Sequence, residues 1–318
     1  MSIPKIVYNP LIPNQEVRLL ATIRSTDIIK LYDKLSGIDT SSYFSSIDSV
    51  SLYQCNTTGY RFYYPFNLAG DGAFYAEIQR KKKHEGLDYY RDWSYDNEFA
   101  RELIFKDAKV LEIGCGTGKF YEGMRLKIND FTGLELNEQA VFQAQEKGYN
   151  VRNELIEEHC KTNPGVYDFV CAFQVLEHIA DVGSFLSASL SCLKKGGMLI
   201  IGVPNNEPYF QRFNKYETFN LPPHHMGLWN LSVFEKLTKF MPLSLKKVMY
   251  APKNERILVD AYLRAKLWSG VKSLPRFHSA YDKLKMLLLA PVTVPLSIIK
   301  RYTTGINGGY IVVAFEKI

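Results

Sequence analysis

The feature of the sequence that most constrains the fold is residues 109–119, where an apolar run meets three closely spaced glycines. Residues 110–113 read Val-Leu-Glu-Ile, which is typical of a buried strand, and glycines follow at positions 114, 116 and 118. This pattern predicts a strand-to-helix turn whose backbone a ligand can approach closely. The helix after such a turn begins with unpaired N–H groups, which favour a polar or anionic group. A dinucleotide-binding fingerprint is excluded, because Lys119 stands where its third glycine belongs.

The composition favours a protein of the cytoplasm with a large core. The chain has 318 residues, of which 46% are apolar, so one or two domains are expected. Five scattered cysteines without tight pairing are typical of a reduced compartment. The first residues have no secretory pattern, and no run reaches the roughly 18 apolar residues that cross a bilayer. The net charge of +6 is too mild to indicate nucleic acid by itself.

Strands and helices alternate between residues 106 and 206 at the spacing of a doubly wound parallel sheet. Strands are expected at 131–136, weakly near 149–152, at 167–173, and within 193–204, with later candidates at 245–250 and 310–316. Before them, residues 1–104 are expected to form a cap. Its parts are a helical segment over residues 1–50, with a helix starting near Ser25, and a β-hairpin of strands 51–55 and 60–65. A further helix is expected from about Ser232, with Phe234, Leu237 and Phe240 on one face.

Four motifs occur in one order along the chain. They are Glu112 with the three glycines, Glu135 roughly twenty residues beyond the turn, Phe-Gln-Val-Leu-Glu-His at 173–178, and Lys-Gly-Gly at 195–197. Together they resemble class I S-adenosylmethionine-dependent methyltransferases over about 105–250 and the terminal strand. The chain is similar to the small-molecule branch that carries Leu-Glu-His-Ile and Pro-Pro-His-His segments. The resemblance implies an α/β fold with a doubly wound, mostly parallel, seven-stranded Rossmann-like sheet whose last strand is antiparallel.

The resemblance also divides the chain and assigns a cofactor site. The methyltransferase core would comprise residues 105–250 and 307–318, with a basic, apolar helical insertion at 251–306 before the last strand. S-adenosylmethionine is the implied cofactor. The backbone of the glycine turn would lie against its methionine part, Glu135 would bind its ribose, and Leu136 would lie beside its adenine. The residues implied in binding it are Glu112, Gly114, Cys115, Gly116, Gly118, Glu135, Leu136, Phe173 and Gln174.

An oxygen or carbon acceptor must lose a proton during methyl transfer, so a base with a pKa near the working pH is needed. Histidine suits this role. His178, His224 and His225 all follow sheet strands, at the edge where open α/β folds bind ligands. A structural hydrogen-bonding role is the alternative, especially for His178. No metal site is expected, because the zinc-knuckle outline at 55–59 has Thr58 in place of its second cysteine.

The segment 251–306 has two interpretations. Its part from 261 to 306 holds eight Lys or Arg residues and one acid, Asp282, and contains an apolar run broken by Pro291 and Pro295. Such a segment can contact an anionic membrane surface, which would place the enzyme peripherally at the cytoplasmic face. The favoured alternative is a helical cap that packs on the acceptor side and forms a homodimer contact, because apolar helix faces mostly pack against protein.

The sequence therefore predicts a methyltransferase for a small acceptor. A hydroxyl of a sugar, a sugar nucleotide or a glycan precursor is the leading candidate, and it rests on the family resemblance alone. One alternative is an RNA methyltransferase, and another is a cofactor-binding module without catalysis. Nucleic acid is disfavoured, because no Asn/Asp-Pro-Pro-Tyr/Phe/Trp sequence follows the fourth strand.

Overall fold

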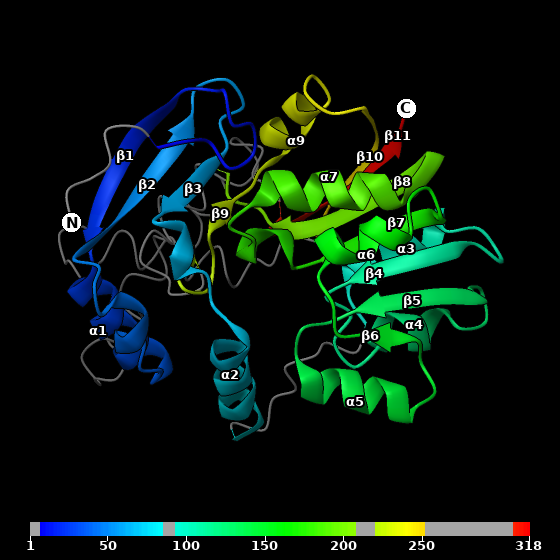
Figure 1. Cartoon of the computed structure of the whole chain (residues 1–318), viewed down its shortest axis with the longest axis horizontal. Helices are drawn as coiled ribbons and strands as arrows, with labels where there is room; N and C mark the ends of the chain where they lie inside the picture. The colour runs from blue at the N-terminus through cyan, green and yellow to red at the C-terminus, as the bar shows by residue number, and fades with distance from the viewer. Residues whose placement is uncertain (1–6, 85–92, 208–219, 252–307) are drawn as a thin grey trace, which may run out of the picture.

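The computed structural model describes residues 7–84, 93–207, 220–251 and 308–318, and these form two β-sheets with helices around them (Figure 1). The larger sheet has seven strands in the order β10-β11-β8-β7-β4-β5-β6. Its strands are β4 (Lys109–Ile113), β5 (Asp130–Leu134), β6 (Val151–Arg152), β7 (Tyr167–Phe173), β8 (Leu193–Pro204), β10 (Leu243–Tyr250) and β11 (Tyr310–Lys317).

The pairing in this sheet is the one that the family resemblance implies. Strands β5 and β7 flank β4 in parallel, and β6 and β8 extend the parallel set on either side. The last strand, β11, runs antiparallel to both of its neighbours, β8 and β10. The prediction of a doubly wound, mostly parallel sheet with an antiparallel last strand is confirmed.

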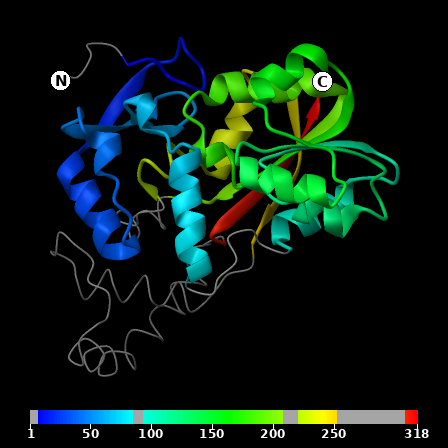
Figure 2. The same ribbon diagram turned by 60° about the horizontal axis from the view of Figure 1, so that its bottom comes forward.

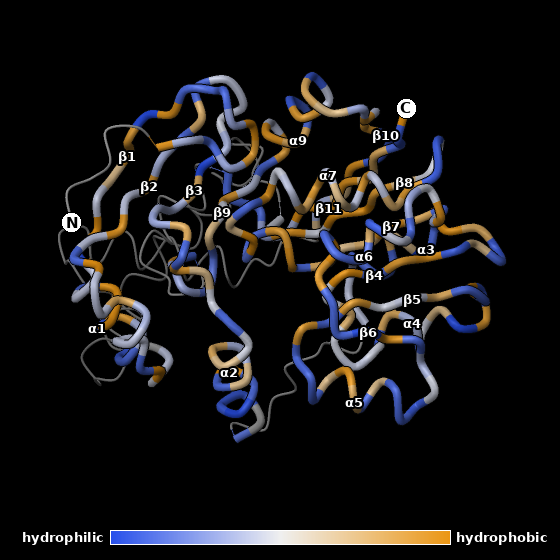
Figure 3. The backbone as a smooth tube through the Cα atoms, viewed as in Figure 1, coloured by the Kyte–Doolittle hydropathy of each residue, from blue (hydrophilic) through white to orange (hydrophobic). Residues whose placement is uncertain are grey.

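Both faces of the sheet are buried, which explains why its central strands are mostly apolar on both sides. In β7, Val170 and Ala172 face one core, whereas Phe169 and Cys171 face the other. The first core is covered by α6 (Ile156–Thr162), α7 (Val182–Cys192) and α9 (Leu231–Leu237). The second is covered by α3 (Tyr95–Leu103), α4 (Lys119–Met124) and α5 (Glu138–Glu146). Figure 3 shows the hydrophobic residues concentrated along these central strands.

A second sheet of four strands, in the order β1-β2-β3-β9, lies beside the first (Figures 1 and 2). Its strand β9 comes from late in the chain and pairs with β3 in antiparallel register. The two sheets share one hydrophobic core, in which Tyr60 and Phe62 pack with Trp229 and Phe234. The elements of this part are β1 (Val17–Arg24), α1 (Ser25–Ser36), η1 (Ser41–Phe44), β2 (Ser49–Cys55), β3 (Arg61–Tyr64), η2 (Phe66–Leu68), α2 (Gly72–His84) and β9 (Gly227–Leu228).

Two expectations about these elements were wrong. Residues 1–50 contain the strand β1 in addition to the expected helix. β1 is an edge strand that is mostly exposed on both sides, so its sequence lacks the apolar alternation of a half-buried strand. The helix α9 ends at Leu237, so Phe240 does not share its buried face and is 39% exposed. The hairpin β2–β3 and the helix at Ser25 are confirmed.

None of the helices in the described ranges is long and apolar enough to cross a bilayer. Nearly all of the segment 251–306 lies outside the described residues, so both of its interpretations stay predictions.

We expect Gly227→Ala to destabilise the junction of the two sheets. A Cβ atom at this position would lie 2.3 Å from the Tyr60 hydroxyl and 3.1 Å from Trp229 Nε1, and both side chains belong to the shared core. Overpacking of this kind costs about 1–3 kcal/mol, which urea unfolding would measure. Gly72→Ala is the matched control, because a Cβ there meets no atom within 4 Å. Equal stability of the two variants would contradict the expectation.

Candidate active site

The glycine turn after β4 packs tightly against the segment that follows β7. Gly114 has φ = 72°, and a Cβ atom built on it would lie 2.4 Å from Val175 Cγ2. Both the backbone conformation and the lack of space therefore require glycine here. Gly118 also requires glycine, since its φ is 79° and the ring of Tyr149 occupies the space where a Cβ atom would lie. Gly114, after β4, thus contacts the segment after β7, whereas Gly118 contacts the segment just before β6.

Glu135 lies beside this turn and is held by two backbone amides. The N–H of Gly116 donates to Oε2 at 2.8 Å, and the N–H of Asn137 donates to Oε1 at 2.8 Å. The structure therefore brings the acid that follows β5 to the glycine turn that follows β4. Each carboxylate oxygen can accept further hydrogen bonds, so Glu135 can also receive the hydroxyls of a bound ribose.

Glu112 is a buried acid at the base of the turn. It is 5% exposed, and its Oε2 atom has no hydrogen-bond partner among the described residues. Burial, and secondarily the charge of Glu135, raises the pKa of the Glu112 carboxyl well above its usual range. An unpartnered buried oxygen costs stability and is ready to bind a donor such as an ammonium group or a water molecule. Glu112 thus fits a ligand that presents an amine at this turn.

The other residues implied in cofactor binding line the same edge of the sheet in different ways. The side chain of Cys115 is buried against Gly133, so only its backbone faces the turn. Leu136 is 55% exposed, and this side chain is free to cover a flat ligand. Phe173 ends β7 and meets Phe120 edge-on, with ring centroids 5.2 Å apart.

Gln174 and Asp96 form a contact that sequence reasoning missed. Gln174 has a positive φ of 58°, which is unusual for a residue other than glycine and is often found at functional sites. Its Nε2 donates to Oδ2 of the buried Asp96 at 3.0 Å. Asp96 also lies against Gly202 of β8, where a Cβ atom would meet its carboxylate at 2.7 Å. The capping box at Ser94 and Asn97 signals the start of α3, but nothing in the sequence signals that Asp96 reaches across the sheet.

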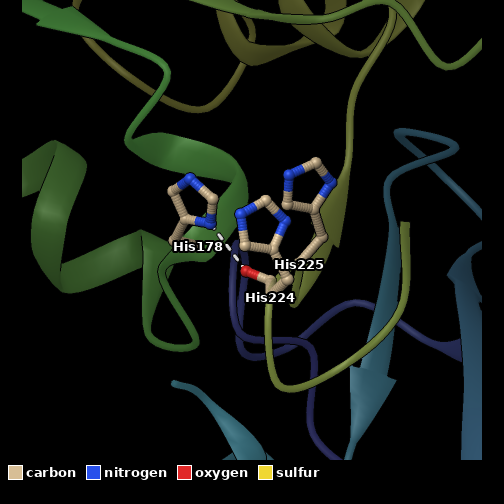
Figure 4. Close-up of side chains that lie close together, drawn as sticks. All are labelled: His178, His224 and His225. Atoms are coloured by element: carbon tan, nitrogen blue, oxygen red, sulfur yellow. Dashed lines mark hydrogen bonds between the residues drawn. The ribbon is translucent and has the colours of Figure 1, made fainter. Parts of the chain in front are cut away.

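The three histidines predicted as catalytic come together at one point (Figure 4). His178 ends the 3₁₀ turn η3 (Leu176–His178) after β7, while His224 and His225 lie in the loop before β9. Ring centroids are 4.8 Å apart for His178 and His224, 5.0 Å for His178 and His225, and 4.5 Å for the stacked pair. The structure thus joins two segments that are 46 residues apart in the sequence.

Two of these histidines are held in the neutral form. Burial lowers the pKa of His178 to about 4, although hydrogen bonds to backbone oppose the shift. Burial and the neighbouring His224 and His178 rings lower the pKa of His225 well below its usual value. His225 is only 4% exposed, and its Nδ1 has no hydrogen-bond partner among the described residues. A neutral imidazole keeps a nitrogen lone pair, so it can accept a proton or bind a cation.

The glycine turn and the histidine cluster are neighbours. Val175 packs against Gly114, and its carbonyl accepts the N–H of His178 at 2.9 Å. Both features lie where parallel strands end, at the edge of the sheet where α/β folds bind ligands. A molecule in the glycine turn would therefore lie next to the three imidazoles.

We expect Glu112→Gln to stabilise the ligand-free protein at alkaline pH. Because folding raises the pKa of Glu112, the folded protein is favoured most below pH about 4.5, where the carboxyl is protonated. This stabilisation is lost as the pH rises and the buried carboxyl must become charged. Removing the charge should therefore increase the free energy of unfolding by about 1–2 kcal/mol at pH 8, and less at pH 5. Urea unfolding at both pH values tests this. The exposed Glu146, replaced by Gln, should show no such pH-dependent gain.

Comparison with known proteins agrees with this geometry. The model of a methyltransferase domain family matches residues 86–247, which is half of the chain. The chain is 35% identical over 117 residues to the ubiquinone biosynthesis O-methyltransferase of Pectobacterium carotovorum, covering 35% of this chain and 48% of that protein. It is 32% identical over 106 residues to the enzyme of the same name from Dechloromonas aromatica, covering 31% and 46% respectively. The chain thus spans about half the length of these curated relatives.

A solved structure shows the same fold. It is a SAM-dependent methyltransferase from Archaeoglobus fulgidus, with a TM-score of 0.50 and 17% sequence identity, and the match covers 77% of this chain and 100% of that one. At this identity the likeness concerns the fold alone. The family match, together with the strand order and the glycine turn, leads to one conclusion: the chain belongs to the methyltransferase domain family.

Proposed function

We propose that the protein is an S-adenosylmethionine-dependent methyltransferase that acts on a hydroxyl group of a small acceptor. The observation that carries the proposal is the position of the three histidines immediately beside the glycine turn and Glu135. The family and the fold support the cofactor. The O-methyltransferase relatives support oxygen as the acceptor atom.

The cofactor would be held by the residues of the turn. S-adenosylmethionine supplies an activated methyl group, so the protein needs mainly to position the acceptor in line with it. The exposed backbone at Gly114 admits the methionine part, and the orphaned oxygen of Glu112 suits its amino group. Glu135 would accept the ribose hydroxyls. Leu136 would lie beside the adenine, with Phe173 and Gln174 completing the floor of the site. Gly118 would contribute through its packing with Tyr149.

The histidine cluster would form the acceptor side of the site. A hydroxyl that becomes methylated must release its proton, and a neutral imidazole can take it. Of the three, His225 is the best candidate to accept this proton, because its buried Nδ1 lacks a partner among the described residues. Tyr75 of α2, in the part of the chain that contains the four-stranded sheet, packs against the cluster, and its ring centroid lies 5.4 Å from that of His178. The cap and the core would thus share the acceptor site.

The acceptor class is tested by incubating the protein with methyl-labelled S-adenosylmethionine and four sets of acceptors. These are nucleotide sugars, lipid-linked glycans, phenolic quinone precursors and RNA. The sequence favours the first two sets, and the names of the relatives favour the third. Label on a small-molecule hydroxyl supports the proposal. Label on RNA alone would replace it with the nucleic-acid alternative.

We expect Glu135→Gln to weaken binding of the product S-adenosylhomocysteine by about 10- to 100-fold. The substitution keeps the size of the side chain but removes the charge, and hydrogen bonds to a charged group contribute about 1.5–3 kcal/mol each. Isothermal titration calorimetry measures the change. The exposed Glu138, also replaced by Gln, is the control and should leave affinity unchanged. An unaltered affinity in the Glu135 variant would remove this residue from the cofactor site.

We expect the double variant His224→Ala/His225→Ala to lose methyl transfer by at least about 100-fold, as is typical when a general base is removed. Its affinity for S-adenosylhomocysteine should stay within about twofold, because the turn that binds the cofactor is untouched. Turnover is measured with the acceptor found above, and His84→Ala is the control, since His84 is exposed at the end of α2. Normal turnover in the double variant would exclude these two histidines from the mechanism.

A further inference from the structure

The three histidines meet a geometric condition for binding a metal ion. One ring nitrogen of each lies within 4.8 Å of a ring nitrogen of the other two. The rings come from two separate elements and converge on one point, as Figure 4 shows. Zinc bound tetrahedrally by imidazoles at about 2.0–2.1 Å holds its ligand nitrogens roughly 3.3 Å apart. Binding of such an ion would therefore bring these nitrogens roughly 1.5 Å closer together and turn the stacked His224 and His225 rings apart.

A hydrogen bond to a backbone carbonyl fixes the ring of His178. Its Nδ1 lies 2.6 Å from the backbone carbonyl oxygen of His224, so Nδ1 carries the hydrogen and donates it. This leaves the lone pair on Nε2. A backbone carbonyl that accepts the second N–H of a ligating histidine is a common outer partner at metal sites, because it fixes both the tautomer and the ring plane. The hydroxyl of Tyr75 donates to the same carbonyl at 3.3 Å and steadies it.

Two further observations indicate that the cluster takes a cation. The buried Nδ1 of His225 has no hydrogen-bond partner in the part of the chain that the structure describes. A buried ring nitrogen without a partner costs stability unless a ligand satisfies it. In addition, Oε1 of the buried Glu177 lies 3.9 Å from Nε2 of His178, so a carboxylate stands at the edge of the cluster. A carboxylate next to nitrogen lone pairs favours a positive ion over a neutral ligand.

We propose that His178, His224 and His225 form a binding site for a divalent transition metal ion of the Zn²⁺ type. Three imidazoles are a ligand set for such ions, and three protein ligands leave a position open for the acceptor oxygen. From the sequence we expected no metal, because Thr58 replaces the second cysteine of the zinc-knuckle outline at 55–59, and the three histidines were considered only as a base or as structural residues.

The role of the ion rests on the proposed methyltransferase function. A bound cation would hold the acceptor hydroxyl and lower its pKa, so that the hydroxyl proton passes to water. The oxygen would then form a bond to the methyl carbon while the carbon–sulfur bond breaks. The electron pair of that bond stays on sulfur and neutralises the sulfonium. With the ion bound, this route would replace the imidazole base proposed above: the histidines would hold the metal, and water would take the proton.

The experiment uses the full chain without a polyhistidine tag, stripped of metal by chelator and titrated with Co²⁺ and with Zn²⁺. We expect one Co²⁺ per chain, with visible ligand-field absorption bands that Zn²⁺ abolishes by displacement. Removing an outer partner of a metal ligand costs about 10- to 100-fold in affinity, so replacing a ligand should cost more. The variants His178→Ala, His224→Ala and His225→Ala should each lose at least 100-fold, whereas His84→Ala should bind normally.

A second measurement does not depend on substitution, in case a buried variant fails to fold. In the Co²⁺-loaded unsubstituted protein, the paramagnetically shifted N–H protons of the ligating imidazoles are counted by NMR, and three are expected. Binding of S-adenosylhomocysteine checks the folding of each variant. Failure of the unsubstituted protein to bind either metal while it binds S-adenosylhomocysteine would overturn the metal site and leave the histidines as the base. Metal binding without any binding of S-adenosylhomocysteine would instead overturn the proposed function.

Discussion

One short segment, residues 224–229, connects the two sheets and the site through backbone hydrogen bonds. The N–H of Met226 donates to the carbonyl of Glu177 in η3 at 2.8 Å, and the carbonyl of Met226 accepts the N–H of Tyr63 in β3 at 2.9 Å. A few residues later the carbonyl of Trp229 accepts the N–H of Asn206, just beyond β8. The segment is thus paired with both sheets at once. Because His224 and His225 begin this segment, their positions follow from the pairing of the backbone around them.

The junction also carries much of the buried polar chemistry of the protein. Arg61 of β3 is buried and donates to the carbonyl of Asn206, and burial lowers the pKa of its guanidinium to about 10, so it stays charged at neutral pH. The Tyr60 hydroxyl and Trp229 Nε1 are buried without partners among the described residues. Polar groups of this kind cost stability.

The electrostatics of the site divide it into two parts with different tasks. At the glycine turn, Glu112 and Glu135 place two carboxyl groups, which under the proposed function would meet the amino group and the ribose hydroxyls of the cofactor. At the histidine cluster, burial keeps His178 and His225 neutral, so their lone pairs remain available at neutral pH. Val175 connects the two parts through its contact with Gly114 and its hydrogen bond from His178.

The sequence by itself determined the sheet and its glycine turn. The apolar strands are buried on both faces, and the need for glycine at position 114 is local, so patterns of neighbouring residues were enough to reveal them. The sequence also marked the three histidines as candidates. Tertiary structure decided what local patterns do not encode: the strand β1, the reach of Asp96 to Gln174, and the meeting of His178 with His224 and His225. The histidine cluster in particular depends on long-range pairing, because the segment that carries His224 and His225 runs beside η3 and β3, and no spacing along the sequence specifies that arrangement.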